Sequence, residues 1–220
     1  MKYCRFEYEG SPAFGWIETV AGREEITGIS PCLPEDGLPH SGIKKIPHVS
    51  VDAARLLAPV VPSKIVCVGR NYREHAAELG NEVPAEPLIF FKPPSSVIGP
   101  GQTIVRPKIS ARVDHGGELG VVIGKRCRNL RTDEDVRPYI LGYTCVNDVT
   151  ARDLQKKDGQ WTRGKGFDTF CPVGPVVVHT LDPWTGVDVE ARVNGQVKQQ
   201  GNTHDFIFSL DVVIYVISHK

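Results

Sequence analysis

The sequence lacks an excess of charge of either sign. Its 26 Lys and Arg residues balance 26 Asp and Glu residues, so the formal net charge at pH 7 is zero. A general nucleic-acid-binding or membrane-surface protein needs a basic excess. The composition therefore argues against both classes, and we expect neither nucleic acid nor membrane as a partner.

Long apolar runs and targeting features are also missing. No apolar run approaches the roughly 18 residues of a membrane-spanning helix. The first ten residues, MKYCRFEYEG, carry charges where a signal peptide needs its apolar stretch. We therefore expect a cytoplasmic protein.

Several chemical motifs are absent as well. The sequence contains no G-x-G-x-x-G, no Walker A loop, no G-x-S-x-G elbow and no C-x-x-C pair. These absences argue against a nucleotide site, a serine hydrolase, a zinc finger and a thioredoxin-like redox site. The six cysteines are scattered along the chain, and we expect reduced, mostly buried thiols with no catalytic role.

What the chain does contain is frequent turns and short apolar segments. Strand-like pieces at 2–10 and 15–20 are interrupted by Gly- and Pro-rich stretches, and LAPVVPSK at 57–64 resembles a linker. We predict a small N-terminal β domain over residues 1–60 and a main domain over 61–220.

The main domain is predicted to be rich in strands. Five segments rich in Val, Ile and aromatic residues, each bounded by Gly or Pro, predict strands: SKIVCVGR (63–70), PLIFFKPP (87–94), LGVVIGK (119–125), YILGYTCVND (139–148) and CPVGPVVVH (171–179). Helices are predicted at 71–80, closed by Gly80, and at 150–159, where Thr150 and Asp153 resemble a capping box. The predicted fold class is mainly β with a few short helices, without the βαβ alternation of a Rossmann sheet.

Two polar clusters lie in the first half of the main domain. His75 and Glu78 are three residues apart on a predicted helix, so their side chains share a face and can form a general-base pair. Asp114 and Glu118 precede an apolar strand and could ligate a hard cation such as Mg²⁺. The alternatives are a solvated helix face and a glycine turn with surface acids.

A third cluster follows the strand at 139–148. Arg152 and Gln155 lie at helical spacing after Asp148, an arrangement that suits a carboxylate substrate held beside a metal. Asp148 could instead cap the helix. Farther along, Lys165 lies between two glycines that permit close approach to a ligand, although a flexible loop lysine is the commoner explanation.

Taken together, the motifs resemble the fumarylacetoacetate hydrolase family, in its small bacterial-type branch. That branch includes acylpyruvate hydrolases, oxaloacetate decarboxylases and 2-hydroxyhepta-2,4-diene-1,7-dioate isomerases. The resemblance runs from about Ser63 to His219 and is carried by five ordered segments: VGRNYREHAAELGN, PLIFFKPPSSVIGPG, VDHGGELGVVIGK, GYTCVNDVTARDLQ and WTRGKGFDTFCPVGP.

The resemblance implies a β-roll or sandwich with a small N-terminal β appendage, and a homodimer. It also implies Mg²⁺ or Mn²⁺ held by three carboxylates, two of which match Glu118 and Asp148. The family's metal motif is E-x-E-L, and its first Glu falls at Gly116, which supplies no side-chain oxygen. We expect this departure to weaken metal affinity.

Roles for five further residues follow from the same resemblance. His75 with Glu78 matches the lid-helix dyad that activates water or relays protons. Lys165 matches the lysine that stabilises developing negative charge. Arg152 and Gln155 match substrate-contacting positions.

The implied activity is divalent-metal-dependent hydrolysis or decarboxylation of a small 2-oxo acid, of acylpyruvate or oxaloacetate type, through a metal-stabilised enolate. One alternative is isomerisation of 2-hydroxy-diene-dioates in aromatic catabolism, and another is a degenerate, non-catalytic member because of Gly116. Family members follow the stretch resembled by 202–220 with a T-L-x-P-G-D-x-I-x-T-G-T-P segment. Because the sequence stops at Lys220, we expect the catalytic domain over 61–220 to be incomplete at its C-terminus.

Overall fold

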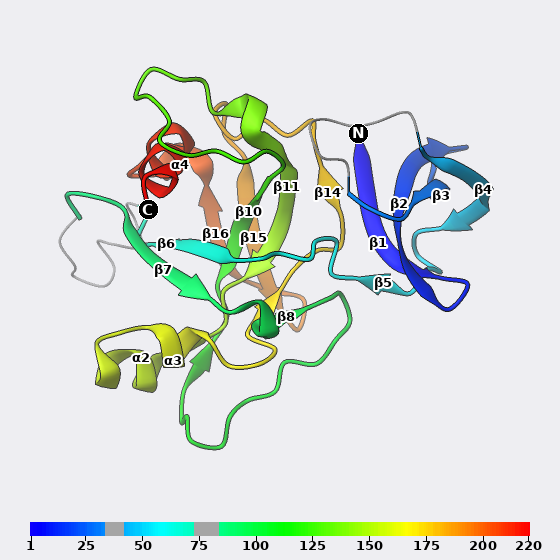
Figure 1. Ribbon diagram of the computed structural model, residues 1–220. Helices are drawn as coiled ribbons and strands as arrows, with labels where there is room; N and C mark the ends of the chain where they lie inside the picture. The colour runs from blue at the N-terminus through cyan, green and yellow to red at the C-terminus, as the bar shows by residue number, and fades with distance from the viewer. Residues whose placement is uncertain (34–41, 73–83) are drawn as a thin grey trace.

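A computed structural model describes residues 1–33, 42–72 and 84–220 of the chain (Figure 1). Within these ranges the protein consists mainly of β-strands with three short α-helices, so the predicted fold class is confirmed. None of these helices has the length and apolar character that a membrane crossing requires.

Five strands come from the N-terminal quarter of the chain: β1 (Lys2–Tyr8), β2 (Ser11–Val20), β3 (Arg23–Ser30), β4 (Lys44–Ser50) and β5 (Leu56–Leu57). The turns Glu9-Gly10 and Ala21-Gly22 join β1 to β2 and β2 to β3. Their φ angles are 50°, 78°, 49° and 79°. Two consecutive residues with positive φ form the turn that matches the twist of an antiparallel pair, and glycine takes this conformation without steric cost.

These five strands belong to the same sheet as strands from later in the chain, which position the predicted metal ligands Glu118 and Asp148. Its further members are β10 (Gly117–Ile123), β11 (Ile140–Asn147) and β14 (Val177–Val178), and the order is β10-β11-β14-β1-β2-β3-β4, with β5 also paired to β1. Val178 of β14 pairs with Tyr143 of β11 and with Lys2 of β1. A single short strand therefore connects the two halves of the sheet. The domain boundary near residue 60 stays a prediction.

Four two-stranded sheets complete the framework. They pair β6 (Ile65–Gly69) with β7 (Leu88–Lys92), β8 (Val97–Ile98) with β13 (Cys171–Pro172), β9 (Val113–Asp114) with β12 (Thr150–Ala151), and β15 (Asp188–Val193) with β16 (Gln196–Asn202). Short 3₁₀ helices span Pro94–Ser96, Arg137–Tyr139 and Thr203–Asp205. The predicted strand at 171–179 is corrected to two short strands, β13 and β14, separated by a segment that contains the cis peptide Gly174–Pro175.

The helices are α2 (Arg152–Asp158), α3 (Thr162–Lys165) and α4 (Leu210–Ser218). In Figure 1, α2 and α3 lie side by side below the strands, whereas α4 lies at the opposite end. The predicted capping box at Thr150 is wrong, because Thr150 lies in β12 and the N-cap of α2 is Ala151, with no side-chain cap bond. The helices α3 and α4 were not predicted from the sequence.

The core that anchors the site lies along β11. Its first five residues, Ile140 to Thr144, are buried. Ile140 and Tyr143 pack with Leu210 and Ile214 of α4. Because one end of β11 is held in this core, the residues that follow its other end are attached to a rigid strand.

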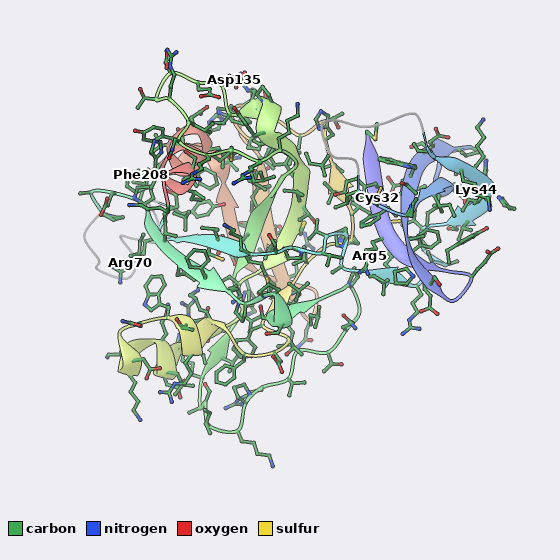
Figure 2. All side chains as sticks on the ribbon, viewed as in Figure 1. Arg5, Cys32, Lys44, Arg70, Asp135 and Phe208 are labelled. Carbon is green, nitrogen blue, oxygen red and sulfur yellow. The ribbon has the colours of Figure 1, made fainter. Side chains whose placement is uncertain are left out.

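Two hydrogen bonds link Asn71 to Phe208, which lies just before α4. The Asn71 side chain donates to the Phe208 carbonyl (Nδ2···O, 3.0 Å) and accepts from the Phe208 amide (Oδ1···N, 2.8 Å). Figure 2 shows Phe208 beside α4 and Arg70 below it. Most of the predicted helix at 71–80, including His75 and Glu78, lies outside the described residues.

Candidate active site

The segments 113–118 and 147–151, which are distant in sequence, lie next to each other in the structure and carry the predicted metal ligands Glu118 and Asp148. Asp114 of β9 pairs in register with Thr150 of β12. Between these strands, the Gly116 amide donates to Asn147 Oδ1 (3.0 Å), and the Gly116 carbonyl accepts from the Asp148 amide (2.7 Å). Backbone pairing thus brings the second and third polar clusters of the sequence together.

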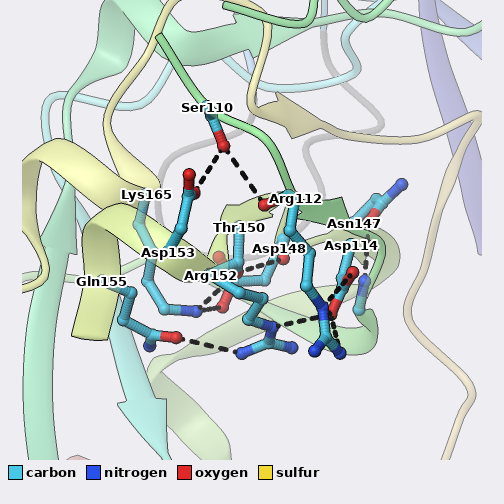
Figure 3. Close-up of polar contacts among 11 residues, drawn as sticks. Ser110, Arg112, Asp114, Asn147, Asp148, Thr150, Arg152, Asp153, Gln155 and Lys165 are labelled. Carbon is cyan, nitrogen blue, oxygen red and sulfur yellow. Dashed lines mark hydrogen bonds and ion pairs between the residues drawn. The ribbon is translucent and has the colours of Figure 1, made fainter. Parts of the chain in front are cut away.

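Asp148 is held between two buried lysines. Lys92, 1% exposed at the end of β7, donates from Nζ to Asp148 Oδ1 at 2.7 Å and to the Val149 carbonyl at 3.2 Å. Lys165, 4% exposed on α3, forms an ion pair with the other carboxylate oxygen and donates to Thr150 Oγ1 at 3.0 Å. Figure 3 shows the Lys165 side chain directed at Asp148. Both carboxylate oxygens therefore accept charge-assisted hydrogen bonds.

Aromatic rings line the other side of the Lys165 ammonium. Nζ lies 4.6 Å from the centre of the Phe90 ring and 5.7 Å from that of Trp161. These two rings pack edge to face at 5.3 Å. Burial lowers the pKa of Lys165, and the nearby Asp148 carboxylate opposes this shift. Lys165 is thus a buried helical cation, contrary to the interpretation as a flexible loop lysine.

Glu118 lies on β10, opposite Val146 of β11. The pKa of its carboxyl is raised to about 7, first by burial and second by the negative charge of Asp148, while Lys165, Arg152 and Lys92 act to lower it. A second negative charge beside Asp148 is therefore unfavourable without an added cation. A divalent cation held by both carboxylates would offset this repulsion.

Arg152 and Gln155 lie one turn apart on α2. The Arg152 guanidinium donates from Nη1 to Gln155 Oε1 at 3.2 Å, as the helical spacing predicts. Its charge acts on the pKa values of both Glu118 and Lys165. These two side chains consequently belong to the same electrostatic site as the carboxylates.

Asp148 does not act as a helix cap, because the N-cap of α2 is Ala151 and Asp148 is committed to the lysines. The sequence reasoning missed Lys92. The available signal was a single charge at the end of the apolar run PLIFF, directly before two prolines. In the described ranges, no three His, Cys, Asp or Glu side chains form a metal-binding group.

Comparisons with known proteins identify the family of this chain. Residues 64–220 match the family described as fumarylacetoacetate (FAA) hydrolase C-terminal. The chain is 43% identical to the oxaloacetate tautomerase YisK of Bacillus subtilis, over 77% of this chain and 58% of the relative. It is 39% identical to the 2,4-didehydro-3-deoxy-L-rhamnonate hydrolase of Sphingomonas sp. (strain SKA58), over 99% and 78%.

Among solved structures, a similar fold occurs in the 5-carboxymethyl-2-hydroxymuconate delta-isomerase of Mycobacterium smegmatis. The TM-score is 0.84 at 36% identity, over 99% of this chain and 82% of that one. The named relatives thus include a tautomerase, a hydrolase and an isomerase.

Lys92→Met tests the buried ion pair. The substitution leaves a largely buried Asp148 carboxylate with one cation, and we expect the free energy of unfolding to fall by about 3 kcal/mol. Urea denaturation at pH 7 measures this loss. The control is Arg55→Gln, which breaks the exposed Arg55–Glu7 pair (2.6 Å, Arg55 77% exposed) and should change stability little. Equal losses of unfolding free energy in both variants would contradict a stabilising role for the buried Lys92–Asp148 ion pair.

Glu118 predicts a pH dependence of stability in the metal-free protein. Its folded-state pKa of about 7 lies above the ordinary 4.5, so folding favours the protonated carboxyl. The stabilisation is complete below about pH 4.5 and is lost as the pH rises through 7. Relative to Glu118→Gln, the wild type should lose on the order of 1–3 kcal/mol between pH 5 and pH 8 in EDTA. Parallel stability curves for the two proteins would disprove the shift.

Proposed function

Because this chain belongs to the fumarylacetoacetate hydrolase family, we propose that it catalyses divalent-metal-dependent hydrolysis or decarboxylation of a small 2-oxo acid of acylpyruvate or oxaloacetate type. Enzymes of this family act on small oxo acids. The observation that carries the proposal is the gathering of Glu118, Asp148 and the buried Lys165 ammonium at one end of β10 and β11.

The residues present fit a divalent cation such as Mg²⁺ or Mn²⁺. Glu118 and Asp148 offer carboxylate oxygens, and Mg²⁺ in proteins is commonly held by one or two carboxylates, with water and substrate oxygens completing its shell. Burial and, second, the negative charge of Asp148 raise the pKa of Glu118, and a bound cation would favour the ionised form of this carboxyl. When bound, the cation would polarise the 2-oxo carbonyl as a Lewis acid.

The cationic side chains of the chain would hold the substrate and its developing charge. Lys165 is fixed by Asp148, Thr150 and the Phe90 ring, so its ammonium is preorganised to stabilise an enolate oxygen. Arg152, oriented by Gln155, would bind a substrate carboxylate.

The base of the reaction would come from the segment that contains His75 and Glu78. These two residues lie outside the described ranges, and their role rests on the family motif alone. A His–Glu pair there would activate water for hydrolysis or move a proton to or from the substrate carbon.

Isomerisation or tautomerisation is the second candidate, favoured by the isomerase fold match and the tautomerase relative. Both reactions pass through the same enolate, so the residues described above serve either outcome. We also propose the division into residues 1–60 and 61–220, and a homodimer, on the family resemblance. A non-catalytic member is the remaining alternative, because Gly116 supplies no side-chain ligand.

The test follows the ultraviolet absorbance of the enol forms of acetylpyruvate and oxaloacetate with Mn²⁺, and then with EDTA. A Cβ at position 116 would lie 3.2 Å from the Asp148 carbonyl oxygen, 3.5 Å from Glu118 Oε1 and 3.7 Å from Asp148 Cβ, so a side chain there starts next to both ligand residues after a small shift of the Asp148 backbone. We expect Gly116→Glu to bind Mn²⁺ at least roughly ten-fold more tightly than the wild type and to accelerate the decay. Gly116→Ala, with the same Cβ and no carboxylate, is the matched control.

Pyruvate release separates the candidate reactions. Metal-dependent decay with stoichiometric pyruvate supports hydrolysis or decarboxylation. Decay of the enol without pyruvate supports tautomerisation. An unchanged signal in all three proteins at saturating Mn²⁺ would contradict every catalytic candidate for these substrates and favour the non-catalytic alternative.

A further inference from the structure

Asp114 lies between two arginines at the edge of the site (Figure 3). Arg112 donates to both of its carboxylate oxygens, with Nε 3.3 Å from each and Nη2 3.1 Å from Oδ2. On the other side, Arg152 Nε donates to Oδ2 at 3.2 Å. The carboxylate thus bridges an exposed guanidinium, 72% accessible, and a more buried one, 30% accessible.

Backbone pairing sets this arrangement. Asp114 on β9 lies opposite Thr150 on β12, and the Arg152 amide donates to the Arg112 carbonyl at 2.9 Å. All three charged residues therefore extend from one short antiparallel ladder. Burial acts to raise the pKa of Asp114, but hydrogen bonds from Arg112 and Arg152 outweigh it and lower the pKa below its ordinary range. Asp114 is therefore ionised at neutral pH.

The contacts of Arg152 fix the plane of its guanidinium. Nε is held by Asp114 and Nη1 by Gln155 at 3.2 Å. Because the guanidinium is planar and rigid, two held nitrogens determine where the third must point. Nη2 makes no hydrogen bond to any residue that the structure describes, so its two N–H groups are available to an anion.

The charge count favours an added negative group. Two arginines and one aspartate leave this cluster with one net positive charge. The Arg152 charge also acts on Glu118 and Lys165, which places its guanidinium within electrostatic reach of the proposed reaction centre. A carboxylate bound by Nη2 would therefore lie in the same electrostatic environment as Glu118 and Lys165.

We propose that Asp114 is a positioning residue that holds Arg152 for the second carboxylate of a 2-oxo dicarboxylate. This inference rests on the proposed function and narrows it, since it favours oxaloacetate-type substrates over uncharged acyl chains. If Asp114 served only to neutralise the arginines, its removal would strengthen the binding of every anion. If it positions Arg152, its removal weakens the binding of dicarboxylates alone. The two roles predict opposite signs.

The experiment compares DL-malate with DL-lactate, the unreactive reduced counterparts of oxaloacetate and pyruvate, which differ by one carboxylate. Isothermal titration with Mn²⁺ present gives both dissociation constants. We expect Asp114→Asn to weaken malate binding roughly ten-fold, the effect of one charge-assisted hydrogen bond, and lactate binding less than about two-fold. Tighter malate binding in this variant would overturn the proposal.

The matched control is Asp133→Asn. Arg131 and Asp133 have the same two-residue spacing and a two-pronged contact, with distances of 3.0 and 2.7 Å, but both side chains are exposed. This variant removes the same charge from the protein without touching the site. We expect both dissociation constants to stay unchanged. A loss of malate binding as large as in Asp114→Asn would attribute the effect to net charge and overturn the proposal.

A double-mutant cycle tests whether Asp114 acts through Arg152. In an Arg152→Gln background, Asp114→Asn should have no further effect on malate binding, because the group that it positions is gone. A further ten-fold loss there would overturn the proposal while leaving the proposed function intact. Failure of the wild type to bind malate or lactate would instead contradict the proposed 2-oxo acid site, and this inference with it.

Discussion

The rest of the site depends on the ion pairs that hold Asp148 between Lys92 and Lys165. Each partner comes from a different element, since Asp148 follows β11, Lys92 ends β7 and Lys165 lies on α3. Removing one charge from water without the others would be costly, so the three elements must come together for the protein to fold. The same contacts place the buried Lys165 ammonium against the Asp148 carboxylate, where its charge also acts on Glu118. The ion pairs that stabilise the fold therefore also supply the charges of the proposed active site.

Charge balance then explains the remaining features of the site. Glu118 brings a second carboxyl near Asp148, and burial, followed by the negative charge of Asp148, raises the pKa of the Glu118 carboxyl. At Gly116 the family pattern would add a third carboxylate, and its Cβ would lie 3.5 Å from Glu118 Oε1 and 3.2 Å from the Asp148 carbonyl oxygen, a tight contact that requires a small shift. With glycine there, the local negative charge is smaller, which eases the repulsion and also weakens the pull on a cation.

Named relatives of this chain include a hydrolase, a tautomerase and an isomerase. The proposed chemistry accounts for this range, because hydrolysis, tautomerisation and isomerisation of an oxo acid can each pass through an enolate whose charge a cation would hold. What differs is the fate of that enolate, which depends on the base and on the shape of the substrate pocket. The cluster of Asp114 and its two arginines is therefore a better guide to the substrate than the shared carboxylates are.

The sequence by itself predicted β1, β2, β6, β7, β10 and β11, because Val, Ile and aromatic runs between Gly and Pro favour strands. It did not predict the more polar strands β3, β4, β15 and β16. It also determined which segments carry carboxylates, Arg152 and Lys165, since residue type and spacing are local properties. It did not predict α4, because LDVVIYVIS is rich in β-branched residues and becomes helical only through Ser209 at its N-cap and burial against β11. Only the tertiary structure showed that Lys92 meets Asp148, 56 positions away, and that Asp114 holds Arg152. Such contacts depend on strand register and packing, which no local pattern encodes.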